Sequence, residues 1–224
     1  MQGLTGFGYS LFSLPLLVLI MPASSAVPML SATSIFLNLL VFYRARKSLR
    51  PGWIMPLLVS GVAALPLGIW LLKTMDQGAL KMIIGSLVVL SSSAFLSGFR
   101  VKLRNERWAM IPVGLASGVL NGATTFSGPP VILFFTNQNV GKSEFRAGLA
   151  FYFLALNLVA VPAFIAGGLF SGGVALRTLY LFPAVVAGAL LGVGFSERIS
   201  QKLFNRVALW VLAMLGVFSV LSAL

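Results

Sequence analysis

The chain has 224 residues, of which 58% are hydrophobic and 9% are charged, and its mean hydropathy is +1.00. A soluble domain carries about 25% charged residues, so too few polar side chains are present here to cover a water-facing surface. The sequence therefore predicts an integral membrane protein, and the net charge of +12 is explained by basic cytoplasmic loops rather than by a nucleic-acid partner.

Chemistry is restricted by the residues that the chain lacks. It has no Cys and no His, which excludes thiolate nucleophiles, iron–sulfur clusters, haem ligation and the usual zinc sites. Its four acidic residues lie beside basic residues between apolar runs, an arrangement that does not suit a two-metal carboxylate site. We expect no cofactor and no enzymatic activity.

Eight apolar segments follow one another along the chain, and most are long enough to span a bilayer. They cover residues 2–21, 26–43, 53–73, 79–99, 108–138, 146–168, 175–196 and 203–223. The first segment is irregular because it opens on GLTGFG (3–8), and the fifth is interrupted by NGATTFSGPP (121–130). No basic region follows Met1, so we expect no cleavable signal peptide. The predicted fold class is an all-α polytopic membrane protein.

The two halves of the chain resemble each other. A shift of 119 residues gives nine identities between residues 2–39 and the second half, among them Gly3 with Gly122 and Asn38 with Asn157. A shift of 124 then pairs Val62-Ala63 and Leu67-Gly68 with Val186-Ala187 and Leu191-Gly192. We predict a first repeat over 1–100, a basic cytoplasmic linker over 101–107 and a second repeat over 108–224. Residues 108–120 have no counterpart ahead of Met1, which fits either a shortened first segment or a late start.

The basic residues predict the topology. If every segment crosses the membrane, alternate loops hold nine and seven basic residues, which is almost no bias. If the fifth segment is a re-entrant hairpin, 13 fall on one side and three on the other, as the positive-inside rule prefers. The first segment should then be re-entrant too. Each half has one broken segment and three crossings, so the repeats are inverted, both termini lie outside, and the cluster at 44–50 is cytoplasmic.

The two broken stretches are the candidate binding site, because non-helical backbone at membrane depth must be buried in protein or line a cavity. Pro129 and Pro130 suit the first turn of a helix, so we predict a half-helix that begins near Gly128. Its free amides would bind an anion together with hydroxyl donors from Thr124, Thr125 and Ser127. Gly6 and Gly8 would let a second half-helix approach the same ligand. Tight packing or a simple kink is the alternative interpretation of these residues.

Several other side chains complete the predicted site. Asn38 and Asn157 occupy equivalent positions in apolar helices, where interhelical hydrogen bonding is the alternative role. Asn121 begins the second broken stretch, and Phe7 and Phe126 would wall the pocket unless they serve core packing. We expect no mid-membrane acid for a proton relay, so a coupling proton or cation would depend on backbone carbonyls, hydroxyls or a helix-end acid such as Glu197.

The stretches GLTGFGYSLFSLPLL (3–17), NGATTFSGPPVILFF (121–135) and RAGLAFYFLALN (146–157) resemble those of the sulfite exporter TauE/SafE family. The resemblance implies a multi-pass permease of the plasma or inner membrane that moves sulfite or organosulfonates. It places the first family motif on Gly3, Gly6, Gly8 and Pro15. The second motif falls on Gly122, Ser127, Gly128 and Pro129.

The predicted function is therefore secondary transport of a small sulfur-containing anion, sulfite or an organosulfonate, by alternating access. The expected partners are this anion, the lipid bilayer and a coupling proton or cation where one is used. A transporter of another small organic anion, such as a carboxylate, is the first alternative. An anion channel is the second, although channels are often lined by basic rings and no Lys or Arg lies inside a predicted span.

Overall fold

The computed structural model describes residues 9–49, 51–97, 106–138, 140–195 and 214, and within these ranges the chain is helical without a β-strand. The helices are α2 (Tyr9–Leu17), α3 (Ala23–Ala45), η1 (Arg46–Ser48), α4 (Pro51–Thr74), α5 (Gln77–Leu96), α6 (Glu106–Thr124), α7 (Gly128–Asn137), α8 (Lys142–Ala166) and α9 (Gly172–Phe195). Gly6, Phe7, Gly8 and the predicted segment 203–223 lie outside the described residues, apart from Met214.

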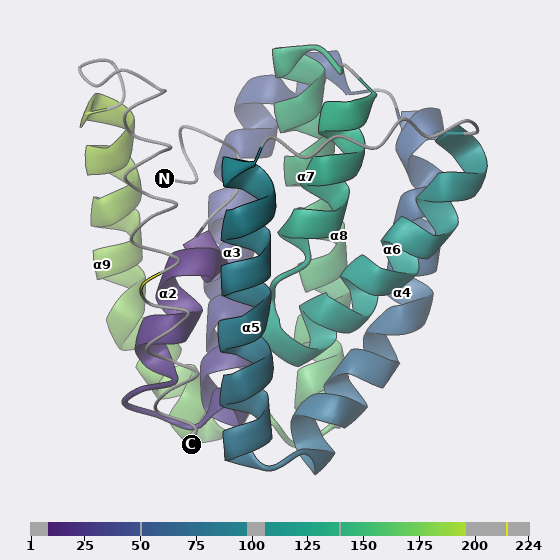
Figure 1. Ribbon diagram of the computed structural model, residues 1–224. Coiled ribbons are helices and arrows are strands. Elements are labelled where there is room, and N and C mark those ends of the chain that lie inside the picture. The colour runs from purple at the N-terminus through teal and green to yellow at the C-terminus, as the bar shows by residue number, and fades with distance from the viewer. Residues whose placement is uncertain (1–8, 50, 98–105, 139, 196–213, 215–224) are drawn as a thin grey trace.

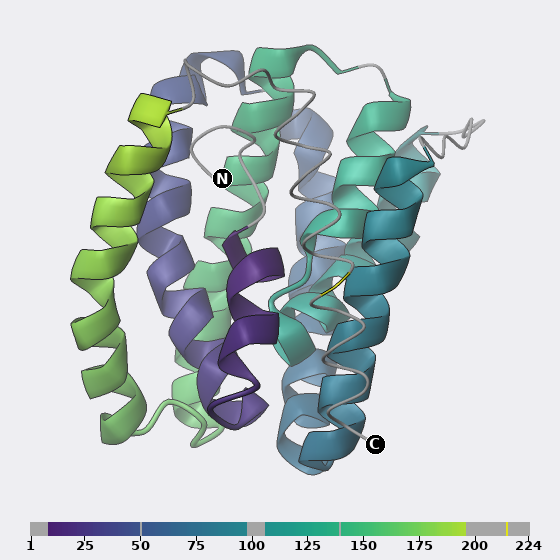
Figure 2. The ribbon, with the colours of Figure 1, turned by 60° about the vertical axis from the view of Figure 1, so that its left-hand side comes forward.

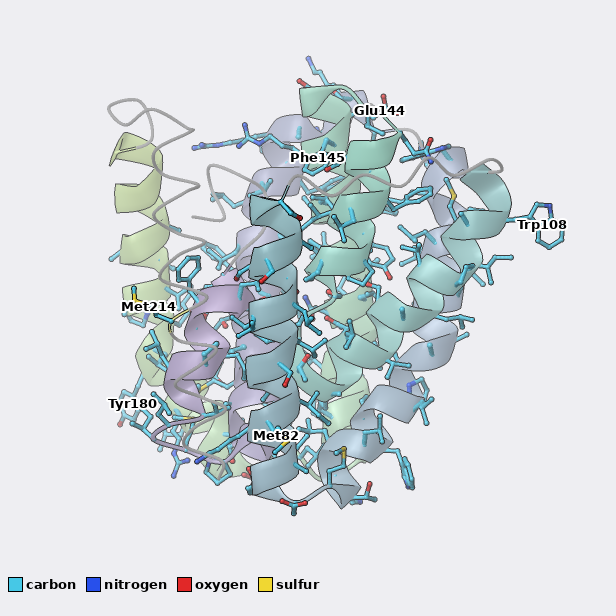
Figure 3. All side chains as sticks on the ribbon, viewed as in Figure 1. Met82, Trp108, Glu144, Phe145, Tyr180 and Met214 are labelled. Carbon is cyan, nitrogen blue, oxygen red and sulfur yellow. The ribbon has the colours of Figure 1, made fainter. Side chains whose placement is uncertain are left out.

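Five of these stretches are long and apolar enough to cross a membrane: Ala23–Ser48, Pro51–Thr74, Gln77–Ala94, Ser143–Ala166 and Gly172–Ala189. Their outer surfaces carry large apolar side chains, as expected where lipid replaces water as the solvent. Trp108 and Tyr180 project from the outside of the bundle (Figure 3), with exposed fractions of 71% and 75%. The structure thus agrees with the all-α membrane protein predicted from composition.

The fifth apolar segment is two helices rather than one. α6 runs from one end of the molecule to its middle, and α7 returns to the same end (Figure 1). The break between the helices covers residues 125–127, which is narrower than the interruption at 121–130 read from the sequence. Asn121–Thr124 remain helical because their backbone continues the ladder of α6, which ends with the Thr125 amide donating to the Asn121 carbonyl oxygen. The half-helix predicted near Gly128 begins at that residue.

The helices pack around this broken pair. α4 crosses α6 over a seam of glycines, and α3 packs against α8 and α9. The turns joining α3 to α4 and α7 to α8 lie at one end of the bundle, whereas those joining α4 to α5 and α8 to α9 lie at the other (Figures 1 and 2). α2 begins near mid-height of the bundle (Figure 1), where α6 meets α7. The first residues of α2 therefore lie beside the break between α6 and α7.

Candidate binding cavity at the helix break

The turn between α6 and α7 is held by its own side chains. The Thr124 hydroxyl donates to the Leu120 carbonyl oxygen at 2.8 Å and accepts from the Phe126 amide at 3.2 Å. The Ser117 hydroxyl donates to the Ser127 carbonyl oxygen at 2.8 Å, and this bond holds the last residue of the turn against α6. These bonds satisfy backbone groups that lipid could not satisfy.

Thr125 is the strained residue of the turn. Its φ is 59°, in the left-handed region that β-branched residues seldom adopt. The Thr125 hydroxyl donates to the Thr124 carbonyl oxygen at 2.6 Å, so this contact helps to hold the conformation. Strained backbone of this kind tends to occur at binding sites, where the surrounding structure enforces it.

The start of α7 presents donors rather than acceptors. Ser127 is its N-cap residue and makes no side-chain capping bond, and Pro129 and Pro130 occupy the first turn. Helix geometry leaves the Gly128 amide without an intrahelical partner, while the prolines have no amide hydrogen to satisfy. The positive end of the α7 dipole therefore faces the break between α6 and α7.

A cavity of about 40 Å³ lies in front of this helix end. Five helices, α2, α3, α6, α7 and α8, line it together with the break between α6 and α7. The lining residues are Tyr9, Ser10, Leu11, Ser34, Asn38, Asn121, Thr125, Phe126, Ser127, Gly128, Pro129, Phe153 and Asn157. A buried water needs about 10–15 Å³ measured in this way, so the cavity has room for about three waters or one small polyatomic ion.

Three carboxamides from three helices meet at the cavity. Asn38 on α3, Asn121 on α6 and Asn157 on α8 have exposed fractions of 1%, 1% and 4%. The Asn121 carboxamide nitrogen lies 3.5 Å from the Asn157 carboxamide oxygen, a long hydrogen bond that leaves other donor positions of both groups available. The cavity is thus lined by neutral groups that can turn an N–H toward a ligand.

Within the described part of the chain, no charged side chain lines the cavity. Asp76 caps the start of α5, and Glu144 lies in the first turn of α8 at an end of the bundle, far from the break (Figure 3). No acid of the described ranges is therefore placed to repel an anion in the cavity. No group of three or more potential metal ligands occurs in these ranges either.

The structure brings most of the predicted site residues together. Eight of them line the one cavity: Asn38, Asn121, Thr125, Phe126, Ser127, Gly128, Pro129 and Asn157. Thr124 is fully buried behind the lining, where its hydroxyl serves the turn rather than the cavity. Gly6, Phe7 and Gly8 lie outside the described residues.

The cavity has five further lining residues. Ser34 is a weaker candidate from the sequence, and sequence reasoning missed the other four, Tyr9, Ser10, Leu11 and Phe153. The shift of 119 could have found them: it pairs Tyr9 with Gly128, Ser10 with Pro129, Leu11 with Pro130 and Ser34 with Phe153. In three of these pairs both residues line the cavity, as they do for Asn38 and Asn157. The Tyr9 hydroxyl lies 2.9 Å from Thr33 Oγ1 and donates to it, because Thr33 directs its own proton to backbone carbonyls of α3.

Fold and cavity together define a multi-pass protein of the cell membrane with a buried, neutral, donor-rich site at a helix break. The chain belongs to the sulfite exporter TauE/SafE family, whose profile matches residues 1–219. It is 27% identical over 172 residues to a protein of Cupriavidus necator named as a probable sulfite/organosulfonate exporter TauE. That match covers 76% of this chain and 66% of the relative's length. No solved structure matches the chain.

Proposed function

We propose that the chain transports a small sulfur-containing anion and binds its sulfite or sulfonate group in the cavity at the start of α7. One observation carries the proposal: the cavity joins a helix N-terminus to buried amides and hydroxyls, and no carboxylate of the described residues lines it. Family membership supports the same ligand class, since the Cupriavidus necator relative is named for sulfite and organosulfonate export.

The chemistry of the lining suits an anion with several acceptor oxygens. A sulfonate presents three oxygens, and the Gly128 amide, the Ser127 hydroxyl and the cavity carboxamides offer donors from different directions. A helix N-terminus stabilises negative charge without the desolvation cost of a buried lysine. The volume of about 40 Å³ matches an anion of sulfite size, so a larger organosulfonate requires the cavity to open.

Transport by alternating access would use residues from both halves of the chain. Four pairs of positions related by the predicted repeat have both members in the lining of the cavity. A movement of one half against the other would therefore change access to the anion without dismantling its binding site. We propose that coupling, where it occurs, does not use an acid at the cavity.

Ligand-induced thermal stabilisation of the purified protein tests the binding step. Sulfite, sulfoacetate, an aromatic sulfonate and matched carboxylates are each titrated in detergent. A ligand at 100 times its Kd should stabilise the protein by about 2.7 kcal/mol. We expect stabilisation by sulfite or a sulfonate that Ser127→Ala and Asn157→Ala reduce and that the exposed control Ser97→Ala does not.

Transport is then measured as uptake of radiolabelled sulfite into proteoliposomes. Saturable uptake that accelerates when unlabelled substrate is present on the opposite side supports alternating access. Equal stabilisation and uptake with the matched carboxylates would instead support the general organic-anion transporter. Flux that rises linearly with concentration would support a channel, and folded protein that no anion stabilises would rule out the proposed site.

A further inference from the structure

The short helices α2 and α7 bring different side chains to the cavity at their first turns. The shift of 119 pairs Tyr9 with Gly128 and Ser10 with Pro129, and all four residues line the cavity. At Gly128 even a methyl group would lie 3.2 Å from Ile132 Cδ1, so the start of α7 has little room for a side chain. α2 places a phenol ring at the equivalent position. The ring of Tyr9 is therefore the main difference in bulk between the two paired helix starts.

The hydroxyl of Tyr9 is engaged outside the cavity. It donates to Thr33 Oγ1 on α3 at 2.9 Å. Thr33 accepts this bond because its own proton goes to the Met29 and Leu30 carbonyl oxygens, at 3.0 and 3.1 Å. Thr33 is buried and is not among the described residues that line the cavity. Tyr9 thus contributes the bulk of its ring to the cavity, while its hydroxyl fixes the ring to α3.

The other two aromatic residues of the lining are parts of the core. Phe126 and Phe153 are buried, and the Phe153 ring packs edge to face against Tyr152 with 5.7 Å between the ring centroids. The Phe126 amide is bonded to Thr124 within the turn. Tyr9 is only partly buried and packs against the outside of this core. Of the three rings, that of Tyr9 can therefore change or move with the least disturbance of the core.

The shape of a sulfonate makes the bulk of this ring important. Its three oxygens lie on one side of the sulfur and its organic group lies on the other. When the oxygens accept from the Gly128 amide and the cavity carboxamides, the organic group points away from these donors. It is then directed toward lining that offers no donor, such as the ring of Tyr9. Sulfite has a lone pair in place of the organic group, so the ring does not obstruct it.

We propose that Tyr9 sets the largest organic group that a bound sulfonate can carry, and that Thr33 holds the ring where it enforces this limit. The inference rests on the proposed function and specifies its substrate class as sulfite and sulfonates with a very small organic group. A cavity of about 40 Å³ that keeps this ring in place has no room for an aromatic sulfonate.

A series of sulfonates tests the limit, because its members share one headgroup and one charge and differ only in the organic group. Kd values of methanesulfonate, propanesulfonate and benzenesulfonate are measured by thermal titration of the full chain in detergent. For the unmodified protein we expect the Kd of benzenesulfonate to exceed that of methanesulfonate by at least about tenfold. Tyr9→Ala should lower this ratio of Kd values to about twofold.

Phe12→Ala is the matched control. Phe12 is also a partly buried aromatic residue of α2, but it does not line the cavity. We expect it to leave the ratio of Kd values as it is in the unmodified protein, even if it lowers the unfolding midpoint. An equal fall of the ratio in Phe12→Ala and Tyr9→Ala would overturn the assignment to Tyr9, because general loosening of α2 would then explain both.

Two smaller changes test the hold on the ring and remain informative if Tyr9→Ala does not fold. Tyr9→Phe and Thr33→Val each remove the hydrogen bond while keeping most of the side-chain volume. Each should lower the ratio by about threefold, in line with the net contribution of one hydrogen bond. The double variant should go no further, because both changes break the same bond. A bond that serves stability alone would change the unfolding midpoint without changing the ratio.

The outcomes separate this inference from the function on which it rests. An unchanged ratio in folded Tyr9→Ala overturns the size limit, as does unmodified protein that binds benzenesulfonate as tightly as methanesulfonate. An unchanged ratio in both Tyr9→Phe and Thr33→Val overturns the role of Thr33. In each of these cases an anion is still bound, so the proposed function stands. Folded protein that no sulfite, sulfonate or carboxylate stabilises overturns the proposed function and the size limit together.

Discussion

Thr125 holds a backbone conformation that costs a β-branched residue about 1–3 kcal/mol, and it does so in the wall of the polar cavity. The left-handed φ turns the chain sharply, so that α7 starts beside the end of α6 instead of continuing it. A glycine would make the same turn without strain. The threonine hydroxyl at the cavity is therefore the feature that a glycine would lose.

Replacing Thr125 with glycine should raise stability while weakening anion binding. Relief of the strain, less the entropy cost of glycine of about 0.5–1 kcal/mol, leaves a gain of about 1 kcal/mol. Unfolding in detergent measures the gain, and ligand titration measures the loss. Thr124→Gly is the matched control: its hydroxyl bonds to Leu120 and Phe126 are lost without relief of strain, so stability should fall. A loss of stability in Thr125→Gly would contradict a strained turn.

Asn38 and Asn157 should act on the ligand to a similar extent, because they reach one cavity from paired helices. Each substitution by alanine removes a donor and should weaken anion binding by about tenfold, which corresponds to about 1.4 kcal/mol. Kd values from the thermal titration report the change. Ser31→Ala is the control, since Ser31 is fully buried on the same helix as Asn38 but does not line the cavity. Lower stability with unchanged affinity would assign the asparagines to helix packing instead.

At the scale of elements, the seam between α4 and α6 fixes the position of the break. Gly118 lies against the Gly61 carbonyl, and Gly122 approaches the Leu65 carbonyl and the Ile69 amide at 2.5 and 2.7 Å from the position of an added Cβ. Backbone cannot rotate away as a side chain can. The small residues of this seam thus let α6 cross α4 closely enough to bring Asn121 and Thr125 to the cavity.

Gly118→Ala should therefore destabilise the protein by about 1–3 kcal/mol, the usual cost of overpacking. The measurement is the unfolding midpoint in detergent. Gly52→Ala, in the first turn of α4, is the matched control, because a Cβ there meets nothing within 4 Å. It should be neutral or stabilising by up to about 1 kcal/mol. Equal effects at the two positions would show that the seam tolerates separation.

Local chemistry accounts for what the sequence predicts at this scale. The two prolines and the glycine identify the start of α7 because their backbone preferences act within one turn. Tyr9, Ser10 and Phe153 reach the cavity through tertiary packing, which leaves no mark in the local pattern. Thr124 shows the converse: it has the right residue type and position for an anion donor, but its hydroxyl satisfies the backbone of the turn.

At the scale of the whole molecule, hydrophobicity and charge predict an all-helical membrane protein, because these are properties of many residues together. The re-entrant path of the fifth segment is also predicted by charge, since it is the arrangement that gathers basic loops on one side. A groove between α2, α3 and α9 could not be predicted from periodicity, because it is defined by which helices surround it.

The path of the chain through the membrane predicts which loops share a side. The turns after α3 and α7 lie at one end of the bundle and those after α4 and α8 at the other (Figure 1). Single cysteines at exposed positions can report this, since the chain has none of its own. Lys47→Cys and Ser143→Cys should react alike, and Thr74→Cys and Ser171→Cys should react alike but oppositely to the first pair.

A membrane-impermeant maleimide applied to intact cells and then to lysed cells makes the measurement. The positive-inside rule places the Lys47 end in the cytoplasm, so Thr74→Cys and Ser171→Cys should be labelled in intact cells and the other two after lysis. If α6 and α7 formed one crossing, Ser143→Cys would be labelled under the same condition as Thr74→Cys rather than under the same condition as Lys47→Cys. Because that comparison depends on parity and not on absolute orientation, it tests the hairpin even if the whole molecule is inserted the other way round.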